Sequence, residues 1–195
     1  ALNHLPKAVR QMESKLRAIF SEAAETDPVR EMMREAIDKT IKDSGLGDSE
    51  KEELRKEFDL FEEELGDFQF ALSRPYYTLP EKKNKNSGGL ISITVNPYTC
   101  KGCMECVQVC EDDALRPVMQ TDQSVKRLQK DWDFWMDLPS TSPKFSRIDN
   151  LEEGIGALET LLLDKSHYNA FASGDGACLG CGEKTVVHLF VSTVE

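Results

Sequence analysis

The chain has 195 residues, of which 30% are charged and 39% are hydrophobic, and its formal net charge at pH 7 is -11. This acidic balance argues against nucleic-acid binding, which needs a basic footprint. No apolar run approaches the roughly 18 residues of a membrane span, and no signal-peptide pattern is apparent, so we expect no membrane association. All six cysteines fall in two metal-like groups rather than in a disulfide framework, which predicts a reducing, cytoplasmic compartment.

The first region, residues 1–74, carries helical signals and no catalytic ones. Apolar residues recur at helical spacing over 5–23 and again over 29–41. The segment Ser49-Glu-Lys-Glu52 has the form of a capping box and leads into a third apolar stripe over 54–65. The sequence therefore predicts a helical region, which we interpret as an insertion into the following module or as a docking element.

Residues 75–89 are expected to form a linker, because prolines, glycines and polar residues there break regular structure. Leu90 to Val95 then alternates as a strand. Leu115 to Val118 could be the paired strand, which Pro117 confines to a sheet edge. With a short helix from Met104 to about Asp112, these elements predict half of a ferredoxin-like module over residues 90–121.

Four cysteines carry the clearest chemical signal, in the order Cys100, Cys103, Cys106 and Cys110. Their spacing, C-x2-C-x2-C-x3-C, is typical of bacterial ferredoxins that bind iron–sulfur clusters. The short gaps let one loop aim three thiolates at one cluster, whereas the fourth usually ligates a different cluster. Zinc is the alternative metal, but it prefers two separated C-x2-C pairs. The run therefore predicts a [4Fe-4S] site.

The second cysteine group is a single C-x2-C pair, Cys178 and Cys181, set among glycines. Such a pair serves zinc, redox and cluster sites alike, so it is weak by itself. The glycines leave the backbone free to wrap a metal site or to approach a cofactor. A helix-like stretch over 184–194 follows, and its start would offer unpaired N–H groups to an anion.

The stretch from about Ile93 to Phe190 resembles the pyruvate:ferredoxin oxidoreductases, and the 2-oxoacid:ferredoxin oxidoreductases generally. The run Ala177-Cys178-Leu-Gly-Cys181-Gly-Glu183 is similar to the motif that opens the family's thiamine-diphosphate domain. The order of the two cysteine motifs matches, and the aromatic run Trp132 to Pro139 resembles the family's linker. Two departures stand out: Glu111 replaces the usual proline, and the chain has one four-cysteine run where the family has two.

The resemblance implies a role for each site residue. Cys178 and Cys181 would ligate the cluster nearest the thiamine, and Gly182 and Glu183 would lie at the thiamine diphosphate. The remaining ligands divide between two further clusters: one would be held by Cys100, Cys103 and Cys106, and its partner would bind Cys110. Thiamine diphosphate and Mg²⁺ would be bound only in the full-length parent.

The fold class that follows is α+β and mostly helical. An N-terminal helical region precedes a partial ferredoxin-like module and a C-terminal helical segment. A helical connector is expected over 122–173, with helices over 122–136 and 150–163. The start of a truncated thiamine-diphosphate domain is expected over 174–195.

The function implied by the resemblance is electron relay, from thiamine-bound substrate to ferredoxin, within an oxidoreductase that decarboxylates a 2-oxoacid and acylates CoA. The isolated chain is expected to be inactive. Its partners would be other domains of the parent and ferredoxin or flavodoxin, with a homodimer as a further expectation. Two alternatives stay open: a free-standing ferredoxin-like carrier or redox sensor, and a zinc-held interaction module that is redox-inert.

Overall fold

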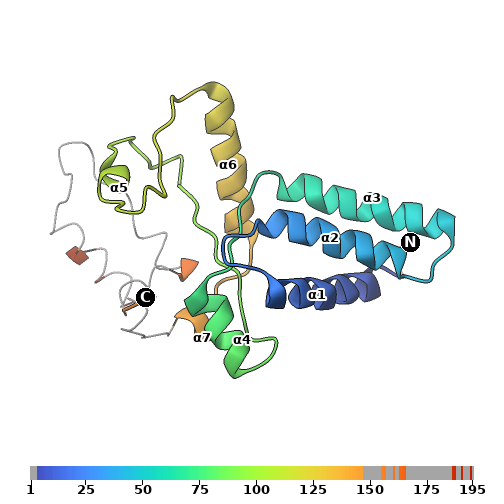
Figure 1. Ribbon diagram of the computed structural model, residues 1–195. Coiled ribbons are helices and arrows are strands. Elements are labelled where there is room, and N and C mark those ends of the chain that lie inside the picture. Colours follow the sequence, from blue (N-terminus) through green and yellow to red (C-terminus); the bar gives the residue numbers. More distant parts are fainter. Residues whose placement is uncertain are drawn as a thin grey trace. The chain divides into compact units, whose positions relative to one another are not determined.

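The computed structural model describes residues 4–146, together with 155, 156, 160, 163–165, 186, 187, 190 and 194. The chain divides into two compact units, Ala1–Ile93 and Thr94–Glu195. The described residues are mostly helical, as predicted (Figure 1). Over residues 4–146 the strand pairing is limited to one antiparallel bridge between Ala71 and Ile91. The predicted predominance of helices is therefore confirmed, whereas the β part of the predicted α+β class is not.

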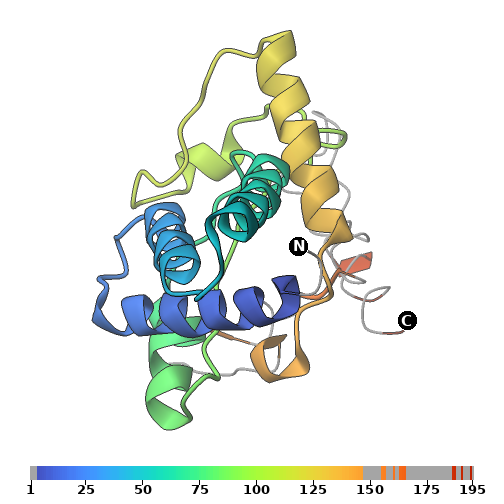
Figure 2. The same ribbon diagram turned by 90° about the vertical axis from the view of Figure 1, so that its right-hand side faces the viewer.

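The three longest helices of the first unit are α1 (Leu5–Glu22), α2 (Val29–Lys42) and α3 (Asp48–Leu65). Helices α2 and α3 run alongside each other, and α1 packs across them (Figures 1 and 2). Each helix follows an apolar stripe of the sequence, because the stripe is the face that leaves water on packing. The resulting core includes Leu16, Phe20, Met32, Met33, Ala36, Ile37, Leu54, Phe58 and Leu65.

The start of α3 differs from the predicted capping box. The helix begins at Asp48, and the cap residue is Gly47, whose N–H donates to the Glu50 carboxylate at 3.1 Å. Glycine has no side chain with which to cap the first turn, so the carboxylate at the third helical position supplies the contact. The stripe over 54–65 located the helix correctly, but the motif over 49–52 placed its start too late.

The segment over 75–89, expected to lack regular structure, is partly helical. A π-helical turn, η1 (Arg74–Thr78), continues into α4 (Leu79–Lys83). Pro75 and Pro80 each lie in a first helical turn, where the missing N–H costs little. The two prolines therefore start helices here instead of breaking them.

Tyr77 ties this segment to the helical core. Its ring is buried and meets Phe20 of α1 edge to face, with 5.5 Å between the ring centroids. Gly88 lies directly against that ring: a Cβ built at Gly88 would be 2.8 Å from Tyr77 Cδ2 and 3.0 Å from its carbonyl oxygen. Position 88 is therefore limited to glycine by its close contact with Tyr77.

The second unit contains α5 (Glu105–Gln108), α6 (Asp122–Asp137) and α7 (Pro143–Ser146). Helix α6 confirms the helix predicted over 122–136. The expected helix over 104–112 is reduced to the four residues of α5. The strand expected over 90–95 is reduced to the bridge at Ile91, and 115–118 are not a strand. The helix expected over 150–163 lies largely outside the described residues.

The reason for the missing strands is visible in their surroundings. Ile93 and Val118 are 81% and 77% exposed, so each segment leaves an apolar side chain uncovered. An isolated pair of short strands is marginal in water without such a cover. None of the helices in the described part of the chain is long and apolar enough to cross a membrane.

Candidate metal centre

Residues 96–114, called here the cysteine loop, are shaped by turns between residues close in the sequence. The Cys100 N–H donates to the Asn96 carbonyl at 2.9 Å, and the Tyr98 N–H donates to the Asn96 side-chain oxygen at 2.9 Å. These bonds form the Asx-type turn expected of an Asn-Pro pair. Gly102 and Met104 then take positive φ angles of 63° and 68° before α5 begins. Left-handed backbone thus lies on both sides of Cys103.

The four thiols of this loop are free and accessible to solvent. Cys100, Cys103 and Cys106 are exposed, and Cys110 is half-buried. The Cys110 sulfur accepts a hydrogen bond from the Ala114 N–H at 3.3 Å. An N–H directed at sulfur stabilises a thiolate, which is the form that binds metals. The sequence spacing gave no sign of this contact, because it depends on how residues 110–114 turn.

The donor set suits an iron–sulfur cluster in its chemistry: four thiols, close in sequence, on one loop, with a backbone N–H already directed at one sulfur. In the described part of the chain, no three His, Cys, Asp or Glu side chains converge on a common point. The four cysteines therefore fit an iron–sulfur cluster by their residue type and by their order in the sequence, and their roles as ligands stay predictions.

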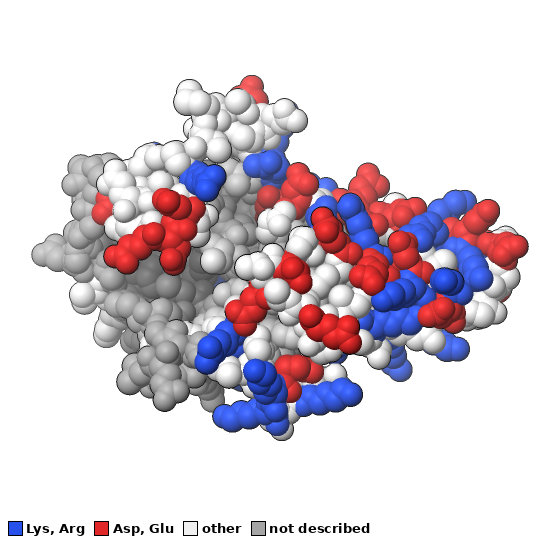
Figure 3. Space-filling view, viewed as in Figure 1, with Lys and Arg blue, Asp and Glu red and all other residues white. Residues whose placement is uncertain are grey.

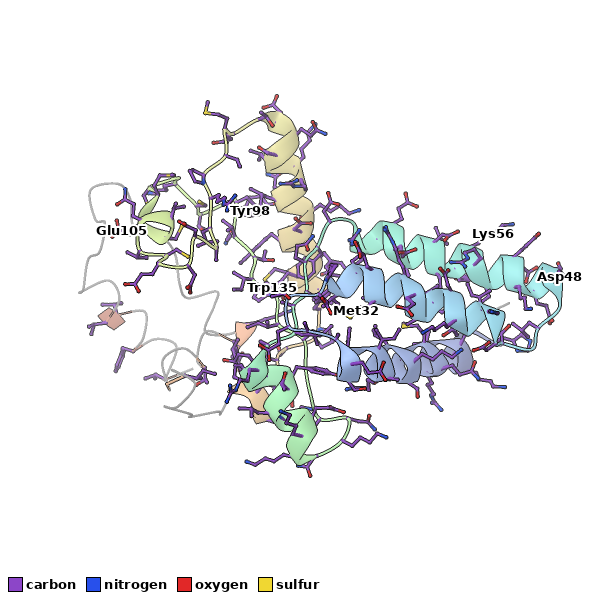
Figure 4. The ribbon with its side chains drawn as sticks, viewed as in Figure 1. Met32, Asp48, Lys56, Tyr98, Glu105 and Trp135 are labelled. Atoms are coloured by element: carbon purple, nitrogen blue, oxygen red, sulfur yellow. The ribbon has the colours of Figure 1, made fainter. Side chains whose placement is uncertain are left out.

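Acidic side chains surround the loop. Glu105 begins α5, and three consecutive acidic residues, 111–113, follow Cys110; all are exposed (Figures 3 and 4). Lys101 and Arg116 are the cations within residues 100–116. Negative charge beside a redox centre disfavours its reduced, more negative form, so these carboxylates would lower the potential of a bound cluster.

Helix α6 contacts the cysteine loop through Tyr98. The Tyr98 hydroxyl lies 3.4 Å from both carboxylate oxygens of Asp133. Although Tyr98 is largely exposed, loss of water around its hydroxyl and then the charge of Asp133 raise its pKa above the ordinary value, so the phenol stays protonated and can donate. Neither residue was singled out from the sequence, because the contact joins positions that no motif relates.

The two tryptophans of α6 pack against each other. Trp132 is buried, and its ring centroid lies 5.3 Å from that of Trp135. The Lys165 ammonium donates to the carbonyls of Met136 and Leu138 at the end of α6 and lies 5.6 Å from the Trp135 ring centroid. These contacts anchor the helix that carries Asp133.

The second cysteine group lies outside the described residues. Cys178, Cys181, Gly182 and Glu183 are all in this part of the chain, and so is the helix expected over 184–194 apart from residues 186, 187, 190 and 194. Their predicted roles at a cluster and at thiamine diphosphate stay predictions.

Comparison with known proteins bears on the same region. Residues 93–116 match the family model of the 4Fe-4S binding domain, and this segment contains all four described cysteines. The chain is 33% identical over 98 residues to pyruvate dehydrogenase [NADP(+)] of Cryptosporidium parvum, covering 50% of this chain and 4% of that protein. It is 30% identical over 105 residues to pyruvate-flavodoxin oxidoreductase of Nostoc sp., covering 50% and 8%.

The predicted family resemblance is confirmed. A probable pyruvate-flavodoxin oxidoreductase of Escherichia coli agrees, with 28% identity over 120 residues that cover 58% of this chain and 9% of that protein. The chain spans less than a tenth of the length of each of these relatives. No solved structure matches the chain. The similarity therefore supports 4Fe-4S binding by residues 93–116.

Proposed function

We propose that the chain is an iron–sulfur electron-transfer segment of a pyruvate-type 2-oxoacid:ferredoxin oxidoreductase. The observation that carries the proposal is a coincidence of two independent facts. The four free thiols of the described loop fall inside the segment that matches the 4Fe-4S binding domain. The relatives that share half of the chain are named as pyruvate oxidoreductases.

In this proposal Cys100, Cys103 and Cys106 hold one [4Fe-4S] cluster, and Cys110 ligates a neighbouring one. A bound cluster supplies one-electron redox chemistry. The protein positions the thiolates through the Asn96 turn and adjusts their charge through N–H donors and carboxylates.

The remaining assignments rest on the family resemblance. Cys178 and Cys181 serve a cluster closer to the substrate, with Gly182 and Glu183 at the thiamine diphosphate and Mg²⁺ of the complete parent. Electrons leave to ferredoxin or flavodoxin, other domains of the parent supply the rest of the site, and the compartment is the cytoplasm. A homodimer is part of the proposal.

Anaerobic reconstitution with iron and sulfide tests the proposal. The chain should bind iron in amounts of about four atoms per cluster and give a paramagnetic signal on reduction. Changing Cys100, Cys103 and Cys106 together to alanine should abolish the signal of this first site. The matched control changes Cys178 and Cys181 to alanine, which should leave the signal of the first site in place. A preparation that takes up zinc and no iron would instead favour the zinc-held module.

The same variants decide the second candidate, a free-standing ferredoxin-like carrier or redox sensor. This candidate is favoured by the confinement of the 4Fe-4S match to residues 93–116. In it, Cys178 and Cys181 complete the same metal site, so their loss should remove the cluster of Cys100, Cys103 and Cys106 as well. Retention of that cluster supports two separate sites and therefore the oxidoreductase segment.

A further inference from the structure

A cavity of about 550 Å³ lies in the first unit, between one face of α1 and the segment that starts in α4. Its volume falls within the roughly 300–1,000 Å³ of small-molecule sites. Its lining is polar and charged, in contrast to the apolar core of the same unit. The lining residues are Arg10, Glu13, Ser14, Arg17, Ala18, Ser21, Glu81, Lys85 and Asn86.

The spacing along α1 explains how the cavity wall forms. Positions 10, 13, 14, 17, 18 and 21 recur at three- and four-residue intervals, so they share one face of the helix. Ala8, Leu16 and Phe20 lie on another face and are buried in the core. The helix therefore packs with its apolar face and presents a separate polar face to the cavity.

Arg17 and Glu81 hold the two walls together. The Glu81 carboxylate accepts from the N–H groups of Asn86 at 2.6 Å and Gly88 at 2.9 Å, and it lies 3.9 Å from the Arg17 guanidinium. Arg17 also donates to Glu13 at 3.1 Å and to the Gly88 carbonyl at 3.5 Å. Burial raises the pKa of Glu81, but these N–H groups and Arg17 outweigh it and hold the pKa below its usual value.

The charges that remain in the cavity are positive. Glu13 and Glu81 are both engaged by Arg17, and Glu81 by two backbone N–H groups as well. Arg10 and Lys85 are exposed, and neither forms an ion pair with another described residue. Lysines 82, 83 and 85 follow one another closely, and Figure 3 shows basic side chains gathered over α4. This concentration is unusual in a chain whose net charge is -11.

We infer that this cavity binds a phosphate-bearing small molecule, with Arg10 and Lys85 as its charged contacts and the Ser14 hydroxyl as a further donor. Guanidinium and ammonium groups form short, charge-assisted hydrogen bonds to phosphate oxygens. The concave wall limits the ligand to the size of a small molecule and disfavours the extended surface of a macromolecule. The inference is independent of the proposed cluster function, because its residues all lie in the first unit.

Titration calorimetry of the full chain with inorganic pyrophosphate and with adenosine diphosphate tests the inference. The double change Arg10→Gln with Lys85→Gln should weaken binding at least tenfold. The matched control, Lys56→Gln with Lys126→Gln, removes the same charge at exposed positions outside the cavity and should leave the affinity within twofold. Added salt should weaken binding to the unmodified chain.

Three outcomes would overturn the inference: no binding of either probe at millimolar concentration, equal loss in the control, or unchanged affinity in the Arg10 and Lys85 variant. Binding of polyglutamate without binding of pyrophosphate would overturn it too, because the cations would then serve an acidic protein. Circular dichroism checks the fold of each variant. If the double variant melts early, Ser14→Ala replaces it and should weaken pyrophosphate binding about threefold or more without lowering the melting temperature.

Discussion

Replacing Gly88 with alanine tests whether its close contact with Tyr77 shapes the first unit. The added Cβ would lie 2.8 Å from Tyr77 Cδ2 and 3.0 Å from the Tyr77 carbonyl oxygen, so part of the clash falls on backbone. Tyr77 cannot move freely, because it is buried against Phe20. Inserting one carbon into such a site costs about 1–3 kcal/mol. For a unit of this size that corresponds to a melting temperature lowered by about 4–24 °C.

The measurement is thermal unfolding followed by far-ultraviolet circular dichroism, to which α1, α2 and α3 contribute strongly. Both tryptophans lie in α6 of the second unit, so their fluorescence reports on that unit separately. The control is a double-mutant cycle with Tyr77→Leu, in which a smaller side chain relieves the contact. A coupling of about 0.5–3 kcal/mol between positions 77 and 88 is expected. A Gly88→Ala cost that is absent, or that is unchanged when Tyr77 is replaced, would refute the reasoning.

Three further changes test the packing, the pH response and a helix cap. Ile37→Ala should lower the free energy of unfolding by about 2–5 kcal/mol, measured by urea denaturation, because Ile37 is fully buried at the centre of α2; a cost below 1 kcal/mol would contradict this packing. Glu81→Gln should cost stability at pH 7, and this cost should shrink as pH falls below about 4.5. The pKa of Glu81 is lower in the folded than in the unfolded chain, so its carboxylate stabilises the fold at pH above the ordinary pKa, and this stabilisation is lost when the carboxylate is protonated. A cost independent of pH would contradict this prediction. Thr121→Ala should destabilise α6 by about 1 kcal/mol, read from tryptophan fluorescence, because the Thr121 hydroxyl accepts from the Ser124 N–H at 3.1 Å; Thr121→Asn is the control and should retain most of the stability.

The helices were predictable from the sequence because their apolar stripes are long and regular. Helix α6 follows its predicted bounds closely, and the core of α2 follows its stripe. The helical turns over 74–83 were missed because proline was interpreted only as a breaker, although it is well suited to a first turn. The strand at 90–95 failed for a different reason: alternation describes a half-buried strand, and Ile93 is 81% exposed.

In the candidate site, too, local features were predictable from the sequence and contacts made by the fold were not. The four cysteines were identified from spacing alone, since ligand type and interval are local properties of a sequence. The contacts around them were not, because Tyr98 meets Asp133 and Cys110 meets Ala114 only after the chain has turned. The cavity beside α1 was missed for a similar reason: it joins residues 10–21 to residues 81–86, and no motif connects those two segments.

The openness of the cysteine loop has a practical consequence for anyone who handles the protein. Cys100, Cys103 and Cys106 are exposed, so dissolved oxygen and peroxide reach their sulfurs directly. Accessible thiolates oxidise first to sulfenic acids and then to disulfides or to irreversible sulfinic acids. Material purified in air would therefore become a mixture of covalently different molecules. Exclusion of air from the first step of purification preserves the ligands on which every metal measurement depends.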